Sequence, residues 1–226
     1  MELPEARAPG PRAGRGGDCA LGTRALAADK KGALQTGATI VFVDESGFSQ
    51  RPSVRRTWAP RGQTPLLREH FNWKRLSAIG AIVWRPDEAR TRLFLSLCPG
   101  SVDSDKAVAF LQNLRRHVRG KVALLWDGLP AHRSGKVKQH IASQDHWLTV
   151  ERLPAYAPEL NPVEALWSAI NAKATANYSP DTIDELDAQL TSAVRLLRRK
   201  AHTGLNFVKH AGLISQDECL ELCKAH

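Results

Sequence analysis

Short apolar runs along the chain predict the strands of one sheet. Residues 38–43 and 122–126 are apolar runs of strand length, and the first is apolar enough to lie in the middle of a sheet. Residues 148–152 should form a fifth strand. Residues 76–84 and 91–98 alternate or run apolar on either side of a turn-like Arg-Pro-Asp-Glu sequence, which is typical of two antiparallel strands. These two strands should form a meander with the first, and the strand at 122–126 should pair beside the first.

Apolar positions with helical spacing predict four helices between and after these strands. They span residues 104–117, 134–143, 162–173 and 181–200, and residues 205–226 are only weakly helical. The last of the four is amphipathic, with its apolar face formed by Ile183, Leu186, Leu190, Val194 and Leu197. Its final turn carries four cations. They either stabilise the helix by interacting with the negative C-terminal end of its dipole or contact DNA. The order of elements predicts an α/β fold, a mixed five-stranded sheet flanked by helices, with a helical C-terminal extension.

A loop rich in proline leads into the third predicted helix. Proline restricts φ and keeps the preceding residue out of the helical region, so Pro154, Pro158 and Pro162 predict a loop that ends where the helix begins. Asn161 then suits the N-cap, Pro162 the first helical position and Glu164 the third, where a carboxylate favours the helix N-terminus. Capped helices often carry a first-turn glutamate, so this position taken alone favours a structural role for Glu164, and the other carboxylates of the chain change that weighting.

Two aspartates follow apolar strands at the points where those strands should end. Asp44 follows residues 38–43, and Asp127 follows residues 122–126. Ligands of open α/β sheets gather outside the carboxyl ends of the strands, so both aspartates should meet Glu164 at one rim. Three carboxylates at one point repel each other unless cations lie between them, and Mg²⁺ binds carboxylates together with substrate phosphates. The pattern therefore indicates phosphodiester chemistry.

Three segments that contain these acids resemble the catalytic motifs of a known family. The sequences DESGF at 44–48, WDGLPAHRS at 126–134 and LPAYAPELNPVEALW at 153–167 are similar to the motifs of mariner-like bacterial insertion-sequence transposases, in the DDE superfamily. The segment RRTWAPRGQTP at 55–65 also resembles this family, and the resemblance covers residues 38–177. Gly128 departs from it, because many relatives carry asparagine after the second aspartate.

The resemblance implies a fold, an activity and roles for the acids. The fold would be ribonuclease-H-like, and the activity would be metal-dependent DNA cleavage and strand transfer during transposition of an insertion sequence. Asp44 would bridge two Mg²⁺ or Mn²⁺ ions, Asp127 would hold one and Glu164 the other. His132 would position a phosphate or the attacking water, although a lone loop histidine is more often structural. A homodimer on DNA is also expected.

The composition favours a basic protein that acts on a polyanion. With 226 residues, 42% hydrophobic and 24% charged, the chain is long enough for one well-packed domain with an appendage. Its net charge of +9 and pI of about 9.7 favour double-stranded DNA as a partner. No apolar run approaches the roughly 18 residues that span a membrane, and no signal sequence is evident, so a cytoplasmic protein is expected. Four scattered cysteines without a CxxC pair predict neither a disulfide framework nor a zinc ribbon.

Residues 51–75 are the strongest candidate for DNA contact. They carry seven lysines and arginines against one acid, with Trp58, Phe71 and Trp73 interleaved. Cations with aromatic side chains suit a phosphate backbone and exposed bases, whereas the simpler interpretation is a solvated hairpin with core tryptophans. The candidate DNA-binding residues are Arg51, Arg55, Arg56, Arg61, Lys74 and Arg75.

The predicted organisation is a tail, a catalytic domain and an extension. Residues 1–37 are rich in glycine and should form no fold of their own, residues 38–177 should form the catalytic domain, and residues 178–226 the helical extension. No helix-turn-helix pattern precedes the catalytic domain. Either a separately encoded DNA-binding half supplies it, or the chain is a truncated, catalytically silent remnant that binds DNA without sequence specificity.

Overall fold

The structure is a computed structural model that describes residues 31–33, 35–63, 65–66, 74–86, 90–128, 131–153, 158–200, 202–215 and 218. The predicted strands and helices are all present, and those at residues 104–117, 122–126 and 148–152 have the predicted ends. In chain order the elements are β1 (Thr39–Ser49), β2 (Arg75–Arg85), β3 (Arg90–Pro99), α2 (Ser104–His117), β4 (Val122–Trp126), α3 (Gly135–Ala142), β5 (Leu148–Arg152), the 3₁₀ turn η2 (Pro158–Leu160), α4 (Pro162–Ala174), α5 (Ile183–Arg199) and α6 (Thr203–His210).

The five strands form one mixed sheet, as predicted. The order across the sheet is β3-β2-β1-β4-β5, which puts β1 in the centre. The β1, β2 and β3 strands are antiparallel neighbours and form the predicted meander, whereas β4 pairs with β1 and β5 with β4 in parallel. The carboxyl ends of β1, β4 and β5 therefore lie at one edge of the sheet, and their amino ends lie at the other.

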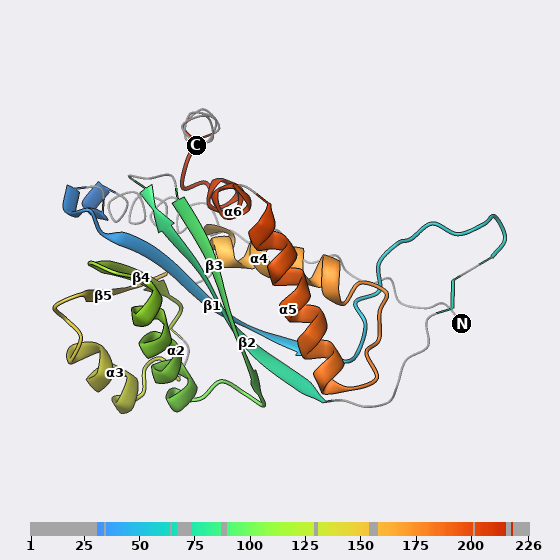
Figure 1. Ribbon diagram of the computed structural model, residues 1–226, viewed down its shortest axis with the longest axis horizontal. Coiled ribbons are helices and arrows are strands. Elements are labelled where there is room, and N and C mark those ends of the chain that lie inside the picture. Colours follow the sequence, from blue (N-terminus) through green and yellow to red (C-terminus); the bar gives the residue numbers. More distant parts are fainter. Residues whose placement is uncertain are drawn as a thin grey trace, which may run out of the picture.

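Helices cover both faces of the sheet (Figure 1). On one face α2 and α3 pack over Val41, Val43 and the inward side of β4, and Leu111 and Leu114 of α2 are fully buried there. On the other face α4, α5 and α6 pack over Ile40 and the residues that alternate with it. Successive residues of a strand point to opposite faces, and the run Ile40 to Val43 is apolar at every position. The β1 strand therefore contributes apolar side chains to both cores.

Asp44 lies inside β1 and not at its end, so the predicted strand boundary is wrong. The cause is that β1 has two partners of different length. It pairs with β4 only from Thr39 to Phe42, but it pairs with β2 as far as Ser49, opposite Arg75. The antiparallel pairing with β2 extends the strand through the polar residues beyond position 43, which the apolar pattern alone does not reveal.

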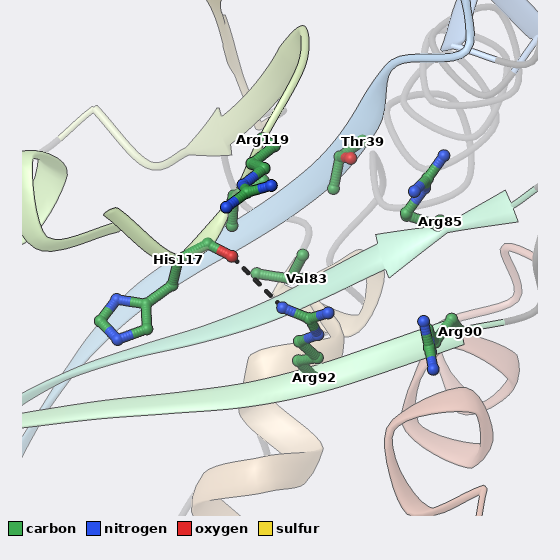
Figure 2. Close-up of a pocket in the computed structure, with 8 residues that line it drawn as sticks. Thr39, Val83, Arg85, Arg90, Arg92, His117 and Arg119 are labelled. Atoms are coloured by element: carbon green, nitrogen blue, oxygen red, sulfur yellow. Dashed lines mark hydrogen bonds between the residues drawn. The ribbon is translucent and has the colours of Figure 1, made fainter. Parts of the chain in front are cut away.

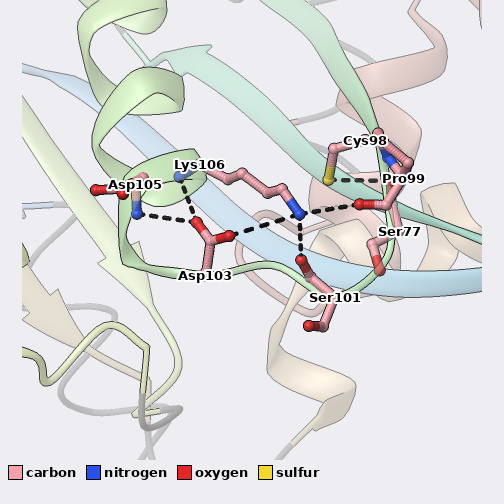
Figure 3. Close-up of polar contacts among 7 residues, drawn as sticks. All are labelled: Ser77, Cys98, Pro99, Ser101, Asp103, Asp105 and Lys106. Carbon is pink, nitrogen blue, oxygen red and sulfur yellow. Dashed lines mark hydrogen bonds and ion pairs between the residues drawn. The ribbon is translucent and has the colours of Figure 1, made fainter.

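The connection from β3 to α2 is fixed by a polar cluster (Figure 3). Asp103 is the N-cap of α2, and its carboxylate accepts hydrogen bonds from the backbone N–H groups of Asp105 at 3.0 Å and Lys106 at 2.9 Å. The Lys106 ammonium donates to the backbone carbonyls of Pro99 at 2.9 Å and Ser101 at 2.6 Å. A side-chain acceptor at the N-cap stabilises a helix by about 1 kcal/mol, so this cluster defines where α2 begins.

The C-terminal helices belong to the main core. The apolar face predicted for α5 is confirmed, because Leu186, Leu190, Val194 and Leu197 are buried in the cluster that also contains α4 and the sheet. Leu205 of α6 is fully buried in the same cluster. Each such leucine stabilises the fold by roughly 1.5–3 kcal/mol. The helices after residue 178 are thus packed against the sheet.

The end of the predicted tail also contacts the core. Residues 31–33 and 35–36 are helical, which the prediction of an unfolded tail did not include, and residues 1–30 lie outside the described part. Ala33 is buried, and its carbonyl accepts a hydrogen bond from the Ala38 backbone at 2.9 Å. No helix in the described part of the chain is long and apolar enough to cross a membrane.

Candidate active site

Asp44 is held on the inner side of β1 by a tryptophan of α4. It is 9% exposed and faces the core that contains α4. The indole N–H of Trp167 donates a hydrogen bond of 2.8 Å to Asp44 Oδ2. The Trp167 ring in turn packs edge-on against Phe48, with ring centroids 5.8 Å apart. The carboxylate therefore has one fixed oxygen, which limits the directions in which the other can bind a ligand.

Gly80 provides the space in which Trp167 lies. It is the β2 partner of Asp44 in the antiparallel register. A Cβ at this position would lie 2.5 Å from the Trp167 ring, closer than carbon atoms approach in folded proteins. The absence of a side chain at Gly80 is what lets the indole reach across β2 to Asp44.

Burial and neighbouring charge raise the pKa of Asp44 to about 6. The largest cause is burial, which disfavours the ionised form, and the hydrogen bond from Trp167 opposes it. The charges of Glu164 and Asp127 raise the pKa further. Glu164 and Asp127 therefore act on Asp44, even though the three acids come from different parts of the chain.

Glu164 lies on the first turn of α4, as the sequence predicts. Asn161 is the N-cap, its side-chain oxygen accepts a hydrogen bond of 3.1 Å from the Val163 N–H, and Pro162 follows at the first helical position. Glu164 is exposed, and it lines a hollow of about 700 Å³ between the start of α4 and α6. Its carboxylate is free to meet a ligand that approaches from solvent.

Asp127 follows the end of β4 and is paired with a buried histidine. Asp44 and Asp127 each lie two residues past the last parallel pair of Phe42 and Leu125, so the register places both at the same edge. His132 Nδ1 lies 2.8 Å from Asp127 Oδ1, and His132 Nε2 lies 2.6 Å from Glu45 Oε1. The imidazole stacks on Trp126, with ring centroids 3.6 Å apart.

The pKa of His132 is raised to about 9, which keeps the imidazole protonated at neutral pH. Burial lowers this pKa, but hydrogen bonds to the carboxylates of Asp127 and Glu45 outweigh burial. Both ring nitrogens therefore act as donors within the protein. In this arrangement His132 orients Asp127, and it has no nitrogen with which to accept a proton from water.

The acids share an electrostatic environment without forming a closed ligand cluster. Within the described residues, no group of three His, Cys, Asp or Glu side chains is close enough to hold a metal ion. Asp44 is tied to Trp167, Asp127 to His132, and Glu164 is exposed to solvent. The donors are nevertheless all carboxylate oxygens, which fits a hard cation such as Mg²⁺ or Mn²⁺.

Residues 50–63 leave the end of β1 as an extended segment, which we call the arm (Figure 1). The predicted DNA-binding residues lie on the arm or at the start of β2. The arm is fastened to the end of α4, where Ser53 exchanges two backbone hydrogen bonds of 3.0 Å with Thr175 and Asn177. Beyond that point Trp58 is fully exposed, so it is not the core tryptophan of the simpler interpretation. The predicted aromatics Phe71 and Trp73 lie outside the described residues. All six candidate cations are exposed: Arg51, Arg55, Arg56, Arg61, Lys74 and Arg75.

Sequence reasoning missed Trp167, Gly80 and Glu45 as parts of the site. Trp167 stands at the end of the third motif, one helical turn after Glu164, so its helical spacing was a usable signal. Glu45 follows Asp44 on β1, and its carboxylate contacts His132. Nothing in the local sequence marks Gly80, because its role depends on α4 crossing β2.

Comparison of the chain with protein families identifies one match. The model for the DDE superfamily endonuclease family matches residues 39–187, which include β1 and run into α5. The matched range contains Asp44, Asp127 and Glu164. No protein with a curated function matches the chain.

Solved structures of a mariner transposase share the fold. The Mos1 transposase paired-end complex with left transposon end has a TM-score of 0.60 at 17% identity, over 99% of this chain and 66% of that one. The catalytic domain of Mos1 mariner transposase has a TM-score of 0.51 at 16% identity, over 92% of this chain and 91% of that one. These likenesses confirm the ribonuclease-H-like fold, and the chain spans about two thirds of the length of the longer Mos1 transposase.

The family and the fold therefore agree. One comparison uses the sequence and the other the backbone. Because the family match covers well over half of its length, this chain belongs to the DDE superfamily of endonucleases.

Proposed function

We propose that this protein catalyses metal-dependent cleavage and strand transfer of DNA during transposition, with Asp44, Asp127 and Glu164 as its catalytic and metal-binding residues. The observation that carries the proposal is that this DDE endonuclease buries Asp44 where the charges of Glu164 and Asp127 act on it. Holding Asp44 buried beside two other carboxylates costs stability. A role in binding a cation explains why the fold maintains that arrangement.

The metal would be Mg²⁺ or Mn²⁺, and two ions would suit the three acids. Mos1 structures have been solved with each of these metals. When bound, such ions polarise the phosphodiester and stabilise charge on the attacking and leaving oxygens. Asp44 would bind through Oδ1, because Oδ2 accepts the Trp167 hydrogen bond. Glu45 and His132 would orient Asp127 towards the ions.

Duplex DNA would lie across the end of the sheet that carries Asp44, Asp127 and Glu164, and against the arm. The exposed arginines of the arm suit phosphates, and the exposed indole of Trp58 suits stacking or a partner surface. One of the matched Mos1 structures is a strand transfer complex, with a TM-score of 0.59 at 18% identity, over 99% of this chain and 65% of that one. We propose a homodimer on DNA.

Recognition of the element ends would need a further component. Contacts to phosphates carry no sequence information, and reading base edges requires an element placed in a groove. We therefore propose that a separately encoded DNA-binding half supplies those contacts. The competing function, a catalytically silent DNA-binding remnant, is not favoured, because binding DNA alone would not require a buried carboxylate at Asp44.

A plasmid nicking assay tests this function. Wild-type protein should convert supercoiled plasmid to the nicked form with Mn²⁺ or Mg²⁺ and not with a chelator. Asp44→Asn, Asp127→Asn and Glu164→Gln should each reduce the rate, whereas Asp184→Asn, at an exposed position on α5, should not. If all three active-site variants nick plasmid at the wild-type rate, the acids are not catalytic.

A further inference from the structure

Four arginines surround a hollow at the end of the sheet opposite the acids (Figure 2). The hollow has a volume of about 320 Å³. Arg85 comes from the end of β2, Arg90 and Arg92 from the start of β3, and Arg119 from the loop after α2. We call this feature the arginine hollow.

The arginine hollow gathers positive charge. None of the described residues that line it is acidic. Arginine presents five N–H donors in a planar fork that matches the oxygens of a phosphate. The lining therefore suits an anionic group with several oxygens.

The backbone of the protein holds Arg92 in position. Its Nη1 donates a hydrogen bond of 3.2 Å to the carbonyl of His117, the last residue of α2. One donor is used in this bond, and the guanidinium remains exposed. Arg119 is also exposed and has no side-chain partner within the described part of the chain. A positioned guanidinium loses less conformational entropy when it binds an anion.

A second hollow continues the basic surface along β3. It has a volume of about 600 Å³, shares Arg92 and His117 with the arginine hollow, and adds Arg198 and Lys200 from the end of α5. Arg198 is fixed by a hydrogen bond of 2.9 Å from its Nε to the Leu93 carbonyl. Because β3 is the edge strand, the two hollows form an open track and not a closed pocket. Such a track fits an extended polyanion better than a single small ion.

The track is separate from the acids. Thr39, which lines the arginine hollow, and Asp44 lie five residues apart in β1, or roughly 17 Å at about 3.3 Å per residue. A phosphate in the hollow could not at the same time meet the acids. Anything bound there is therefore distinct from the reacting phosphodiester.

We propose that the arginine hollow and the adjoining track bind backbone phosphates of a stretch of DNA away from the reacting bond. The proposal rests on the proposed function in one respect, that DNA is the polyanion this protein meets. Inorganic phosphate shares the same chemistry, so the experiment must separate the two ligands.

Salt dependence of DNA binding tests the proposal. Fluorescence anisotropy with a duplex of about 30 base pairs gives the association constant between about 50 and 200 mM salt. The salt slope, the slope of log association constant against log salt concentration, becomes shallower by about 0.9 for each phosphate that the protein no longer neutralises. The Arg92→Gln/Arg119→Gln variant should have a slope shallower by about 1 to 2. The charge-matched control is Lys136→Gln/Lys138→Gln, at two exposed positions on α3 that line none of these hollows, and its slope should equal that of the wild type.

Two outcomes would overturn the proposal. One is a slope for the arginine variant that equals the wild type or the control. The other concerns inorganic phosphate. If phosphate raises the melting temperature of the wild type but not of the arginine variant, while both proteins bind DNA equally, the hollow binds a free anion and not DNA. Should the glutamine variant fail to fold, Arg92→Lys/Arg119→Lys keeps the charge, and it should retain the slope while its affinity falls because lysine cannot bind bidentately.

This experiment is independent of the nicking assay. Asp44→Asn should leave the salt slope in place, because the arginine track remains. Wild-type protein that does not nick plasmid, but whose slope depends on Arg92 and Arg119, would contradict the proposed catalysis and support the track. If the wild type nicks plasmid and the arginine variant has the wild-type salt slope, the proposed catalysis is supported and the arginine track is contradicted.

Discussion

The two ends of the central sheet gather charges of opposite sign in different ways. At the carboxyl end, Asp44 is buried and its pKa is raised to about 6 by burial and by Glu164 and Asp127. At the amino end, Arg92 and Arg119 are exposed. Buried charge responds strongly to its neighbours and little to salt, whereas exposed charge is screened. The acid end is thus suited to a reaction, and the basic end to reversible binding.

The largest expected effect comes from removing the buried charge. Asp44→Asn should slow cleavage by about 10²- to 10³-fold, since the proposed function makes Asp44 a metal ligand. The same variant should be more stable without metal at pH 8, by up to about 3 kcal/mol, because the wild type ionises a carboxyl whose pKa the fold raises to about 6. The asparagine oxygen can still accept the Trp167 hydrogen bond. Nicking rates and urea denaturation measure the two effects, and a loss of both activity and stability would contradict the account of Asp44.

His132 should make stability depend on pH above neutrality. Its folded pKa of about 9 lies above the ordinary 6.5, so the protonated form is stabilised by folding. That contribution, about 3 kcal/mol, is fully present below pH 6.5 and is lost as pH rises to 9. Urea denaturation at pH 6, 7.5 and 9 should show this fall in the wild type. His132→Gln should be less stable at pH 6 and should lose most of the fall, and a parallel fall in both proteins would mean that His132 is not its source.

Metal should relieve the repulsion at the acid end. Mg²⁺ at about 100 times its dissociation constant should stabilise the fold by about 2.7 kcal/mol, through binding to the native state alone. Differential scanning fluorimetry should show a rise in melting temperature with Mg²⁺ that Asp44→Asn loses and that Asp184→Asn retains. An equal rise in Asp44→Asn would place the ion elsewhere.

The indole beside Asp44 should not tolerate a side chain at Gly80. Gly80→Ala should destabilise the fold by about 1–3 kcal/mol, because the added Cβ overlaps the Trp167 ring. Gly47→Ala is the matched control on β1, where a Cβ meets nothing within 4 Å. Urea denaturation compares the two, and tryptophan fluorescence should change only in Gly80→Ala. Equal stability of both variants would show that the indole moves aside without cost.

The smallest effect concerns the arm at the acid end. Alanine at Arg55, Arg56 and Arg61 should make the salt slope of DNA binding shallower by about 0.9 for each phosphate that these arginines neutralise in the wild type. Combining these changes with the Arg92→Gln/Arg119→Gln variant should add the two reductions, since the arm and the arginine track lie at opposite ends of the sheet. A slope that the arm variant leaves unaltered would mean that the arm faces away from DNA.

Local sequence determined the elements and the start of α4. Asn161, Pro162 and Glu164 define the helix start because capping and proline geometry act within a few residues. The apolar faces of β1 and α5 follow from the same short-range periodicity. The three acids were also found from the sequence, since two of them follow apolar runs and one follows a helix cap.

Tertiary structure decided how those acids are held. The length of β1 beyond Val43 came from its pairing with β2, and the hydrogen bond to Asp44 came from Trp167 crossing Gly80. Glu45 and Asp127 are joined by His132, which the chain places far from Glu45 in sequence. The arginine hollow likewise combines the ends of β2 and β3 with the loop after α2. Such contacts depend on which distant segments pair in the sheet and on how the helices cross it, and the periodicity of a single segment determines neither.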